Sequence, residues 1–139
     1  MRPPPATEPP RLSLPDGPSL AAGFGTGALA FADGTIEQHA GPALARRLAE
    51  LPPPMLCHAP ATLRRLGLQR LACADLLELF AFCRPAEACV PTPRGLAAAL
   101  DLPAPRSIEA AAAMLPQAAT LLLRGLAPFF VACAFDEAA

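Results

Sequence analysis

Proline placement limits the secondary structure that this chain can form. Nineteen of its 139 residues are proline, and a proline inside a helix removes a backbone hydrogen bond and clashes with the preceding turn. Seven of the prolines lie within residues 1–18, together with almost no large apolar side chains. Such a segment buries too little surface to offset its loss of conformational entropy. We therefore expect residues 1–18 to form a disordered tail.

An Asp-Gly pair between two extended-looking runs predicts a β-hairpin. Asp33 and Gly34 stand between these runs, and a tight hairpin turn needs the positive φ values that such residues tolerate. The preceding glycines match G-x-G-x-G, but they lead into a hairpin instead of a helix and fall short of the dinucleotide fingerprint. We therefore expect no cofactor there. The expected strands are 20–24, 28–32 and 35–38.

Start and stop signals predict several helices. Pro42 opens a run whose apolar stripe is Leu44, Leu48 and Leu51. Capping residues precede two later runs, and Pro116 is expected to kink or divide the last helix. The capping residues are Thr92 and Ser107. The expected helices are 43–51, 61–66, 75–83, 92–100 and a long one from 107, and a short buried strand is expected at 55–58.

The order of these elements predicts one mixed α/β domain. A chain of this length can bury a core without disulfides or metal, and a hairpin, a helix, a further strand and then helices indicate a small mixed sheet with four or five helices. Large apolar side chains almost encircle helix 75–83, so we expect it to be the most buried element. The domain should span residues 19–127. Residues 128–139 should form an apolar tail that a partner covers or that begins a further segment.

The cysteines and the apolar stretches indicate a cytoplasmic protein. Five cysteines form no C-x-x-C pair, and the first ten residues lack the apolar core of a signal peptide. We expect the cysteines to be reduced and to act as small buried hydrophobes. Cys57, His58 and His39 do not make up a zinc ligand set, so no metal is expected. The stretch 118–135 is too short and too broken to span a membrane, so no membrane partner is expected.

All of the basic residues are arginine, and the net charge is -1. Because the chain has no overall positive charge, any binding to a phosphate backbone must come from a local patch of basic residues. The candidates for nucleic-acid contact are Arg46, Arg47, Arg64 and Arg65. Each pair lies near a glutamate or within a helical pattern, so a solvated helix face is the favoured interpretation.

A series of short phrases resembles a known family. The phrases are Cys57-His-Ala-Pro60, Arg64-Arg-Leu-Gly67, Asp75-Leu-Leu-Glu-Leu-Phe-Ala-Phe82, Arg84-Pro85 and Val90-Pro-Thr-Pro-Arg-Gly-Leu96. They resemble the amino-terminal region of proteobacterial DinG-type superfamily 2 ATP-dependent DNA helicases, which act in DNA repair, over about residues 19–126. The resemblance implies a degenerate ribonuclease-H-like fold of the DEDD exonuclease type. It also implies helicase motor domains as partners, in the same polypeptide or in trans.

The acidic residues of such an exonuclease are mostly absent. Two-metal cleavage needs about four converging carboxylates. The resemblance places the first two acids on the first strand, where this chain has Ala21-Ala-Gly-Phe24, and the third after the histidine loop, where Ala61, Thr62 and Leu63 stand. Only Glu109 is available in the terminal helix. We therefore expect no catalytic residue, no metal and no cofactor. A Walker-type phosphate loop is also excluded, because the chain has no lysine.

The leading hypothesis is a non-catalytic accessory domain of a DNA helicase that positions DNA or docks to the motor, with His58, Asp75 and Glu78 as a structural motif. A second hypothesis is a protein-interaction or oligomerisation module covered along Leu121–Phe135. A third is a stand-alone enzyme in which Cys57, His58 and Asp75 act as nucleophile, base and orienter. Adjacent residues on a strand point to opposite faces, so Cys57 and His58 are not expected to cooperate.

Overall fold

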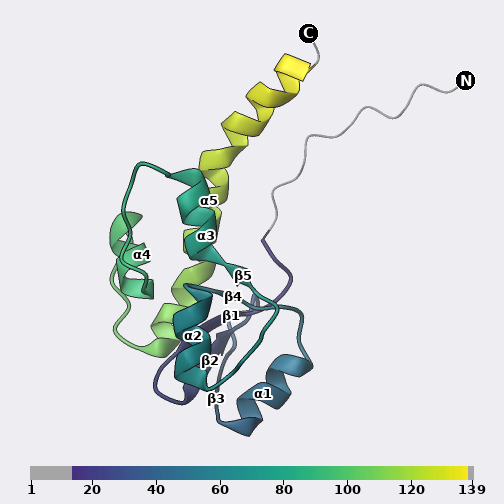
Figure 1. The fold of residues 1–139 in the computed structure, drawn as a ribbon, viewed down its shortest axis with the longest axis vertical. Helices are drawn as coiled ribbons and strands as arrows, with labels where there is room; N and C mark the ends of the chain where they lie inside the picture. The colour runs from purple at the N-terminus through teal and green to yellow at the C-terminus, as the bar shows by residue number, and fades with distance from the viewer. Residues whose placement is uncertain (1–13, 138–139) are drawn as a thin grey trace, which may run out of the picture.

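The computed structural model describes the backbone of residues 14–137 and the side chains of residues 14–126. It contains one five-stranded mixed sheet in the order β3-β2-β1-β4-β5 (Figure 1). The first three strands form an antiparallel meander, and β4 and β5 follow parallel to β1. The strands are β1 (Ser19–Ala22), β2 (Thr26–Ala30), β3 (Ile36–Ala40), β4 (Met55–Leu56) and β5 (Ala74–Asp75). The expected α/β class is confirmed.

Five helices accompany the sheet in the described part of the chain: α1 (Pro42–Ala49), α2 (Ala59–Leu66), α3 (Leu76–Cys83), α4 (Pro93–Ala99) and α5 (Ile108–Glu137). The starts of α4 and α5 agree with the capping signals. Thr92 Oγ1 accepts a hydrogen bond from Gly95 N at 2.9 Å, and Ser107 Oγ accepts one from Ala110 N at 3.1 Å. Each bond satisfies a backbone N–H group that the first helical turn leaves without a partner.

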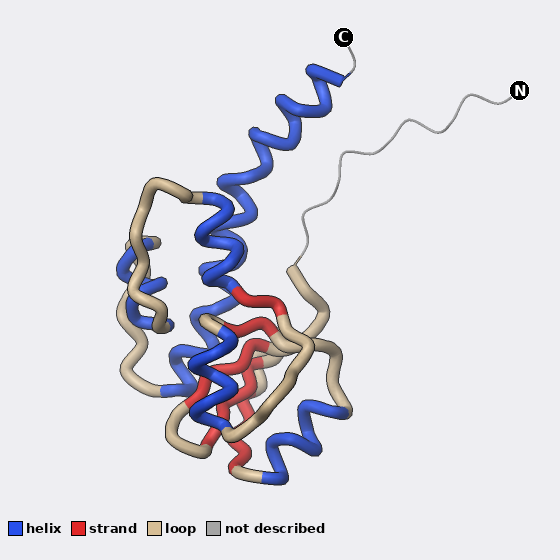
Figure 2. The backbone as a smooth tube through the Cα atoms, in the orientation of Figure 1, coloured by secondary structure: helices blue, strands red, loops and turns tan. Residues whose placement is uncertain are grey.

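Helices cover both faces of the sheet (Figure 2). On one face, leucines of β1, β2 and β4 pack against Leu44 and Leu48 of α1. On the other face, the alanines of β1 and β2 meet Ala111 and Ala112 of α5. Small side chains on both sides of this contact let the helix lie close to the sheet. Further along α5, Met114, Leu115 and Leu122 form a third cluster with residues of α3 and α4.

Glycine has a specific role at two places in the meander. The β2–β3 hairpin forms at the expected Asp-Gly pair, but only Gly34 has a positive φ, at 90°. Gly34 N donates to Phe31 O, and Phe31 N donates to Thr35 O, which is a three-residue loop with glycine at the bulge. The two-residue turn implied by the pattern is therefore wrong. Gly27 has a packing role: a Cβ there would lie 2.7 Å from Leu44 Cδ2 of α1.

The structure departs from three expectations about the helical half. Helix α3 is not the most buried element, since only Leu76 and Phe80 are buried and Phe82 is 66% exposed. Pro116 does not divide the last helix, because α5 runs without interruption from residue 108 to 137. The cost of a proline inside a helix is about 3 kcal/mol, and the buried face of α5 on either side of Pro116 offsets it. The backbone of residues 128–137 therefore belongs to α5 and does not form a separate tail.

The amino-terminal boundary also differs in detail from the expectation. Residues 1–13 of the expected tail lie outside the described residues, as do residues 138 and 139. Pro18 is buried, and its carbonyl oxygen accepts a hydrogen bond from Met55 N at 2.8 Å. The packed structure thus begins before Ser19. Within the described part of the chain, no helix combines the length and apolar character that crossing a bilayer would require.

Candidate functional site

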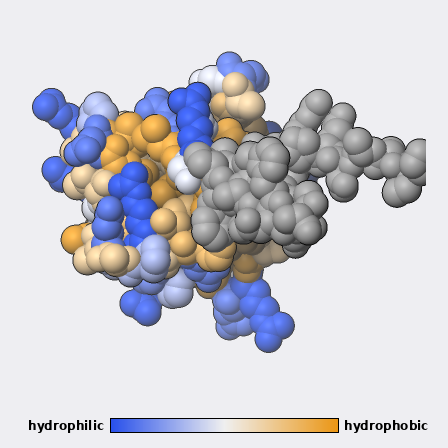
Figure 3. Space-filling model, turned by 90° about the horizontal axis from the view of Figure 1, so that it is seen from above, coloured by the Kyte–Doolittle hydropathy of each residue, from blue (hydrophilic) through white to orange (hydrophobic). Residues whose placement is uncertain are grey.

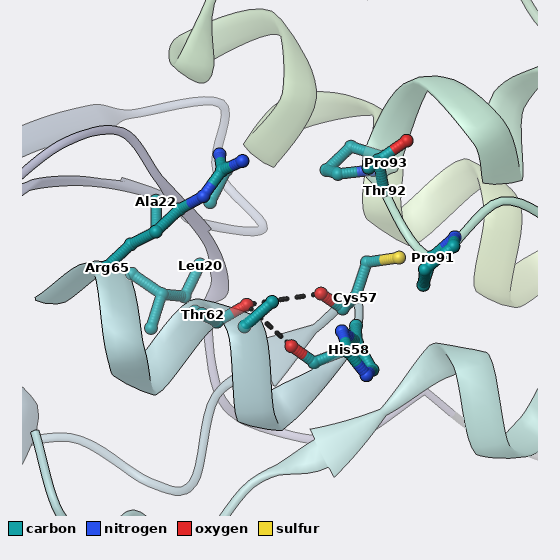
Figure 4. Close-up of a pocket in the computed structure, with 11 residues that line it drawn as sticks. Leu20, Ala22, Cys57, His58, Thr62, Arg65, Pro91, Thr92 and Pro93 are labelled. Atoms are coloured by element: carbon teal, nitrogen blue, oxygen red, sulfur yellow. Dashed lines mark hydrogen bonds between the residues drawn. The ribbon is translucent and has the colours of Figure 1, made fainter.

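A pocket of about 260 Å³ lies at the carboxyl ends of β1 and β4 (Figure 4). Its walls come from β1, from the turn between β4 and α2, from α2, and from the segment that leads into α4. The lining residues are Leu20, Ala21, Ala22, Cys57, His58, Ala61, Thr62, Arg65, Pro91, Thr92 and Pro93. Carboxyl ends of strands are common binding positions in α/β proteins. This pocket is therefore the candidate site.

The pocket brings together positions at which the family resemblance implies catalytic acids that this chain lacks. Ala21 and Ala22 of β1, and Ala61 and Thr62 of α2, all line it. Glu109 stands in the first turn of α5 and does not line it. The pocket consequently has no carboxylate in its wall, and its one formal charge is the guanidinium of Arg65. This lining suits an electron-rich or anionic ligand better than a cation.

His58 lines the pocket in a conformation that is energetically unfavourable. It is the N-cap of α2 in a left-handed conformation, with φ 63° and ψ 86°, a region that residues other than glycine seldom adopt. Its Nδ1 atom is buried and has no hydrogen-bond partner among the described residues. Buried polar atoms without partners and left-handed backbone cluster at functional sites, because packing alone does not favour them. These two features mark His58 as a candidate for ligand contact.

Asp75 holds the backbone around His58 in place. Its Oδ1 accepts hydrogen bonds from His58 N and Leu77 N, both at 2.9 Å, and its Oδ2 accepts one from Ala59 N at 2.8 Å. One carboxylate therefore caps the starts of α2 and α3 together. Glu78 lies exposed in the first turn of α3, where a negative charge favours the helix dipole.

The set Cys57, His58 and Asp75 does not have the geometry of a catalytic relay. The Asp75 carboxylate binds the backbone of His58 and not its imidazole. Burial, reinforced by the nearby Asp75 charge, raises the pKa of the Cys57 thiol to about 12, so its nucleophilic thiolate is scarce near neutral pH. The premise that Cys57 and His58 face opposite ways is wrong, because β4 ends at Leu56 and both residues line the pocket.

Thr62 fixes the turn that carries these residues. Its Oγ1 donates to Cys57 O at 3.1 Å or to His58 O at 3.0 Å, as the dashed lines in Figure 4 mark. The hydroxyl is buried, and the bonds satisfy it. Thr62 is therefore a structural residue of the pocket wall.

An aromatic ring and a guanidinium stand together at the hairpin next to the pocket. Phe24, in the β1–β2 turn, is 91% exposed, and Arg65 Cζ lies 5.5 Å from the centre of its ring. A hydrogen bond from Gly25 N to Arg65 O at 3.1 Å ties the turn to α2. Sequence reasoning did not identify Phe24. The available signal was a large aromatic between two glycines, a loop position that offers it no core to enter.

The four candidate arginines differ in their surroundings. Arg47 pairs with Glu37 at 2.9 Å and with Glu50 at 3.2 Å, and it also lies over the Phe31 ring. Its charge is therefore neutralised within the domain. Arg46 and Arg64 are exposed and form no ion pair with a described residue, but neither lines the pocket. Arg65 alone combines exposure with a place at the pocket.

Across residues 14–126, no group of three or more histidine, cysteine or acidic side chains could hold a metal ion. The four cysteines described there are free thiols, of which Cys57 is buried and Cys73, Cys83 and Cys89 are half-buried. The side chain of Cys133 lies outside the described side chains.

Comparison with known proteins gives no relative. No family model matches the chain, and no curated protein or solved structure is significantly similar to it. The resemblance to DinG-type helicases therefore stays a prediction from short sequence segments.

Proposed function

We propose that this chain is a non-catalytic accessory domain of a DinG-like DNA helicase and that it contacts single-stranded DNA at the Phe24–Arg65 hairpin and the adjoining pocket. The observation that carries the proposal is the convergence of the alanine and threonine positions described above on one pocket that contains Arg65 and no carboxylate. A pocket of this kind can hold part of a nucleic-acid strand but lacks the acids that would hold two cations beside it.

The fold supports the proposal. The resemblance implies a hairpin, a helix, a strand that ends in a histidine loop, an Asp-Leu-Leu-Glu-Leu segment and a terminal helix. The structure has these elements in this order, with His58 in the turn after β4 and Asp75 at the start of α3. Asp75 and the start of α2 are then the scaffold of a site that has lost its chemistry.

Phe24 and Arg65, beside the pocket, supply the kinds of contact that a single DNA strand needs. Proteins that bind single strands without sequence preference stack bases on exposed aromatic rings and pair phosphates with nearby cations. Phe24 offers a ring with 91% of its surface exposed, and Arg65 brings a positive charge to the same place. The net charge of -1 gives the chain no broad attraction for DNA, so binding should depend strongly on these two residues.

The test is the binding of a fluorescein-labelled single-stranded oligonucleotide, followed by anisotropy at low salt. Phe24→Ala and Arg65→Ala should each weaken binding about tenfold, as the loss of one stacked base or one phosphate contact implies. Phe82→Ala and Arg70→Ala are the matched controls, because both residues are exposed and neither lines the pocket. Absence of binding by the unchanged chain at low salt, or equal losses in the controls, would refute DNA contact at this site.

A second candidate function has its own observation. Phe82 at the end of α3 is 66% exposed, and Leu121 of α5 is 37% exposed. The two helices pack together there, with Cys83 Sγ 3.7 Å from Leu122 O. Figure 1 shows α5 continuing beyond α3, and Figure 3, seen from above, shows apolar side chains beside hydrophilic ones where the surface is coloured. The exposed Phe82 and Leu121 fit a protein-interaction module. Such a function predicts binding of a hydrophobic dye that Phe82→Asp lowers.

A further inference from the structure

Strand β3 leaves one edge of the sheet open. It is the outermost strand on its side, it pairs only with β2 among the described strands, and its residues are exposed or half-buried. An open edge presents a row of backbone N–H and C=O groups to any other strand that can align with it. The nature of the partner then depends on which groups point outward and which side chains accompany them.

The hydrogen bonds around β3 identify its outward groups. Phe31 N donates to Thr35 O at 2.9 Å, and Gly41 N donates to Gly25 O at 3.3 Å. Hydrogen-bonded positions alternate along an antiparallel ladder, so the odd-numbered residues from 35 to 41 bond to β2. The backbone groups of Ile36, Gln38 and Ala40 therefore face away from the sheet.

The side chains of β3 are complementary to a second copy of the same strand. In an antiparallel pair centred on Gln38, Ile36 lies opposite Ala40 and Glu37 lies opposite His39. The outward groups make Gln38 a hydrogen-bonded position, so Glu37 and His39 form the non-hydrogen-bonded pairs, in which side chains approach most closely. Each of these two pairs places an imidazole beside a carboxylate of the other copy. Within one copy the same side chains already bond, His39 Nε2 to Glu37 Oε1 at 2.8 Å, and Arg47 donates to both carboxylate oxygens. The cross-copy pairs therefore add charge complementarity between the copies to bonds that each copy already has.

Other registers lose this complementarity. Moving the centre to Glu37 places two carboxylates directly opposite each other, which is destabilising. Moving it to His39 pairs two imidazoles and shortens the ladder. The sequence Ile36–Ala40 thus favours one register with a copy of itself, whereas an unrelated peptide would have no reason to match it.

We propose that β3 pairs antiparallel with β3 of a second copy of this chain, across a two-fold axis through Gln38, so that the two sheets become one. Glu37 and His39 lie on the sheet face that α1 covers, because Arg47 of α1 reaches Glu37. The two α1 helices then lie on the same face of the joined sheet and add contacts beside the strands. Up to about six backbone hydrogen bonds form between the copies.

The association is expected to be weak, because a five-residue ladder is small beside a standard interface, and Kd should lie between about 10 µM and 1 mM. Sedimentation equilibrium of the full chain over that range tests it. Gln38→Pro removes an outward N–H group without touching the bonds to β2, and proline is tolerated on an edge strand, so this variant should be monomeric. Gln38→Thr keeps the N–H group and should still dimerise.

His39→Glu provides a second test that does not alter the backbone. It sets like charges opposite each other in both pairs and should weaken association at least about tenfold. Urea unfolding of each variant shows whether it is folded, and His39→Glu decides the question if Gln38→Pro is not. A wild-type chain that is monomeric at about 1 mM, or a dimer that survives both substitutions, overturns the proposal; a surviving dimer would indicate pairing through another surface, such as α5.

Discussion

Asp75 is the residue on which the geometry of the candidate site depends most. Its carboxylate accepts three backbone hydrogen bonds, two from the start of α2 and one from the start of α3. Asp75→Ala removes all three acceptor contacts. Loss of a helix cap costs about 0.5–2 kcal/mol, and an amide left without its partner in a half-buried place costs about 1–3 kcal/mol. Because water can reach part of the site, we expect a total loss of about 3 kcal/mol in the free energy of unfolding.

Asp75→Asn removes the negative charge of the side chain but keeps its size and shape. The amide keeps one oxygen for His58 N and Leu77 N, but its NH₂ group faces Ala59 N, where Oδ2 now accepts. This substitution should therefore cost about 1–1.5 kcal/mol, in line with one lost hydrogen bond. Asp16→Ala is the control, since Asp16 is exposed and accepts no hydrogen bond from a described residue; it should stay within about 0.5 kcal/mol of wild type.

The assay is urea unfolding of the full chain with linear extrapolation, with the m-value compared among the variants. The expected order of stability is wild type, Asp75→Asn, Asp75→Ala. A loss of less than about 1 kcal/mol in Asp75→Ala, or equal stability of the two variants, would show that the carboxylate does not hold α2 and α3 as described.

Three further predictions concern packing, charge and thiol chemistry. Gly95→Ala should destabilise the fold by about 2–4 kcal/mol, because the added Cβ would overlap the carbonyl of Val90. Gly125→Ala should stabilise it by about 0.5–1 kcal/mol, because a Cβ there meets open space and glycine is unfavourable inside a helix. The urea midpoints of the two variants test both predictions. Hydrogen bonds from Arg47 and His39 lower the pKa of Glu37 from 4.5 to about 2. The stability that the ionised Glu37 contributes is therefore complete above about pH 4.5, and it is lost as the pH falls toward 2. The difference in urea midpoint between wild type and Glu37→Gln should shrink over that interval, and a difference that does not change with pH would contradict the ion pair. Cys57, which is 4% exposed and has a pKa of about 12, should be the slowest of the four described cysteines to react with a thiol reagent, as read by peptide mapping.

Local signals predicted the elements whose boundaries rest on turn and capping chemistry. The Asp-Gly hairpin, the proline that opens α1 and the caps at Thr92 and Ser107 are all present. The stripe of α1 is also present, with Leu44 and Leu48 buried. These features depend on neighbours within a few residues, and a sequence shows such neighbours directly.

Features decided by distant contacts could not be predicted. Strand β5 has only two residues, Ala74 and Asp75, and it exists because it aligns with β4, not because of its own pattern. The continuity of α5 through Pro116 rests on the sheet and the helices that pack along it. The exposure of Phe82 could not be seen either, because a wholly apolar helix does not reveal which of its sides remains uncovered.

The candidate site was predicted in part. The sequence indicated the missing acids and a structural role for Asp75. It gave no sign of the left-handed turn at His58, which needs the strand to end at Leu56, and it did not show that Arg65 would stand beside Phe24. That pair joins residues about forty positions apart in the chain, and only folding brings them together.

The proposed function requires the pocket to contact DNA without cleaving it. The most direct measurement incubates the labelled single strand with the wild-type chain and Mn²⁺ at low salt, and it follows anisotropy and strand length in the same sample. We predict bound DNA of unchanged length, with binding that Arg65→Ala reduces. Shortening of the strand by the purified chain, or an anisotropy that stays at the value of free DNA, would contradict the account.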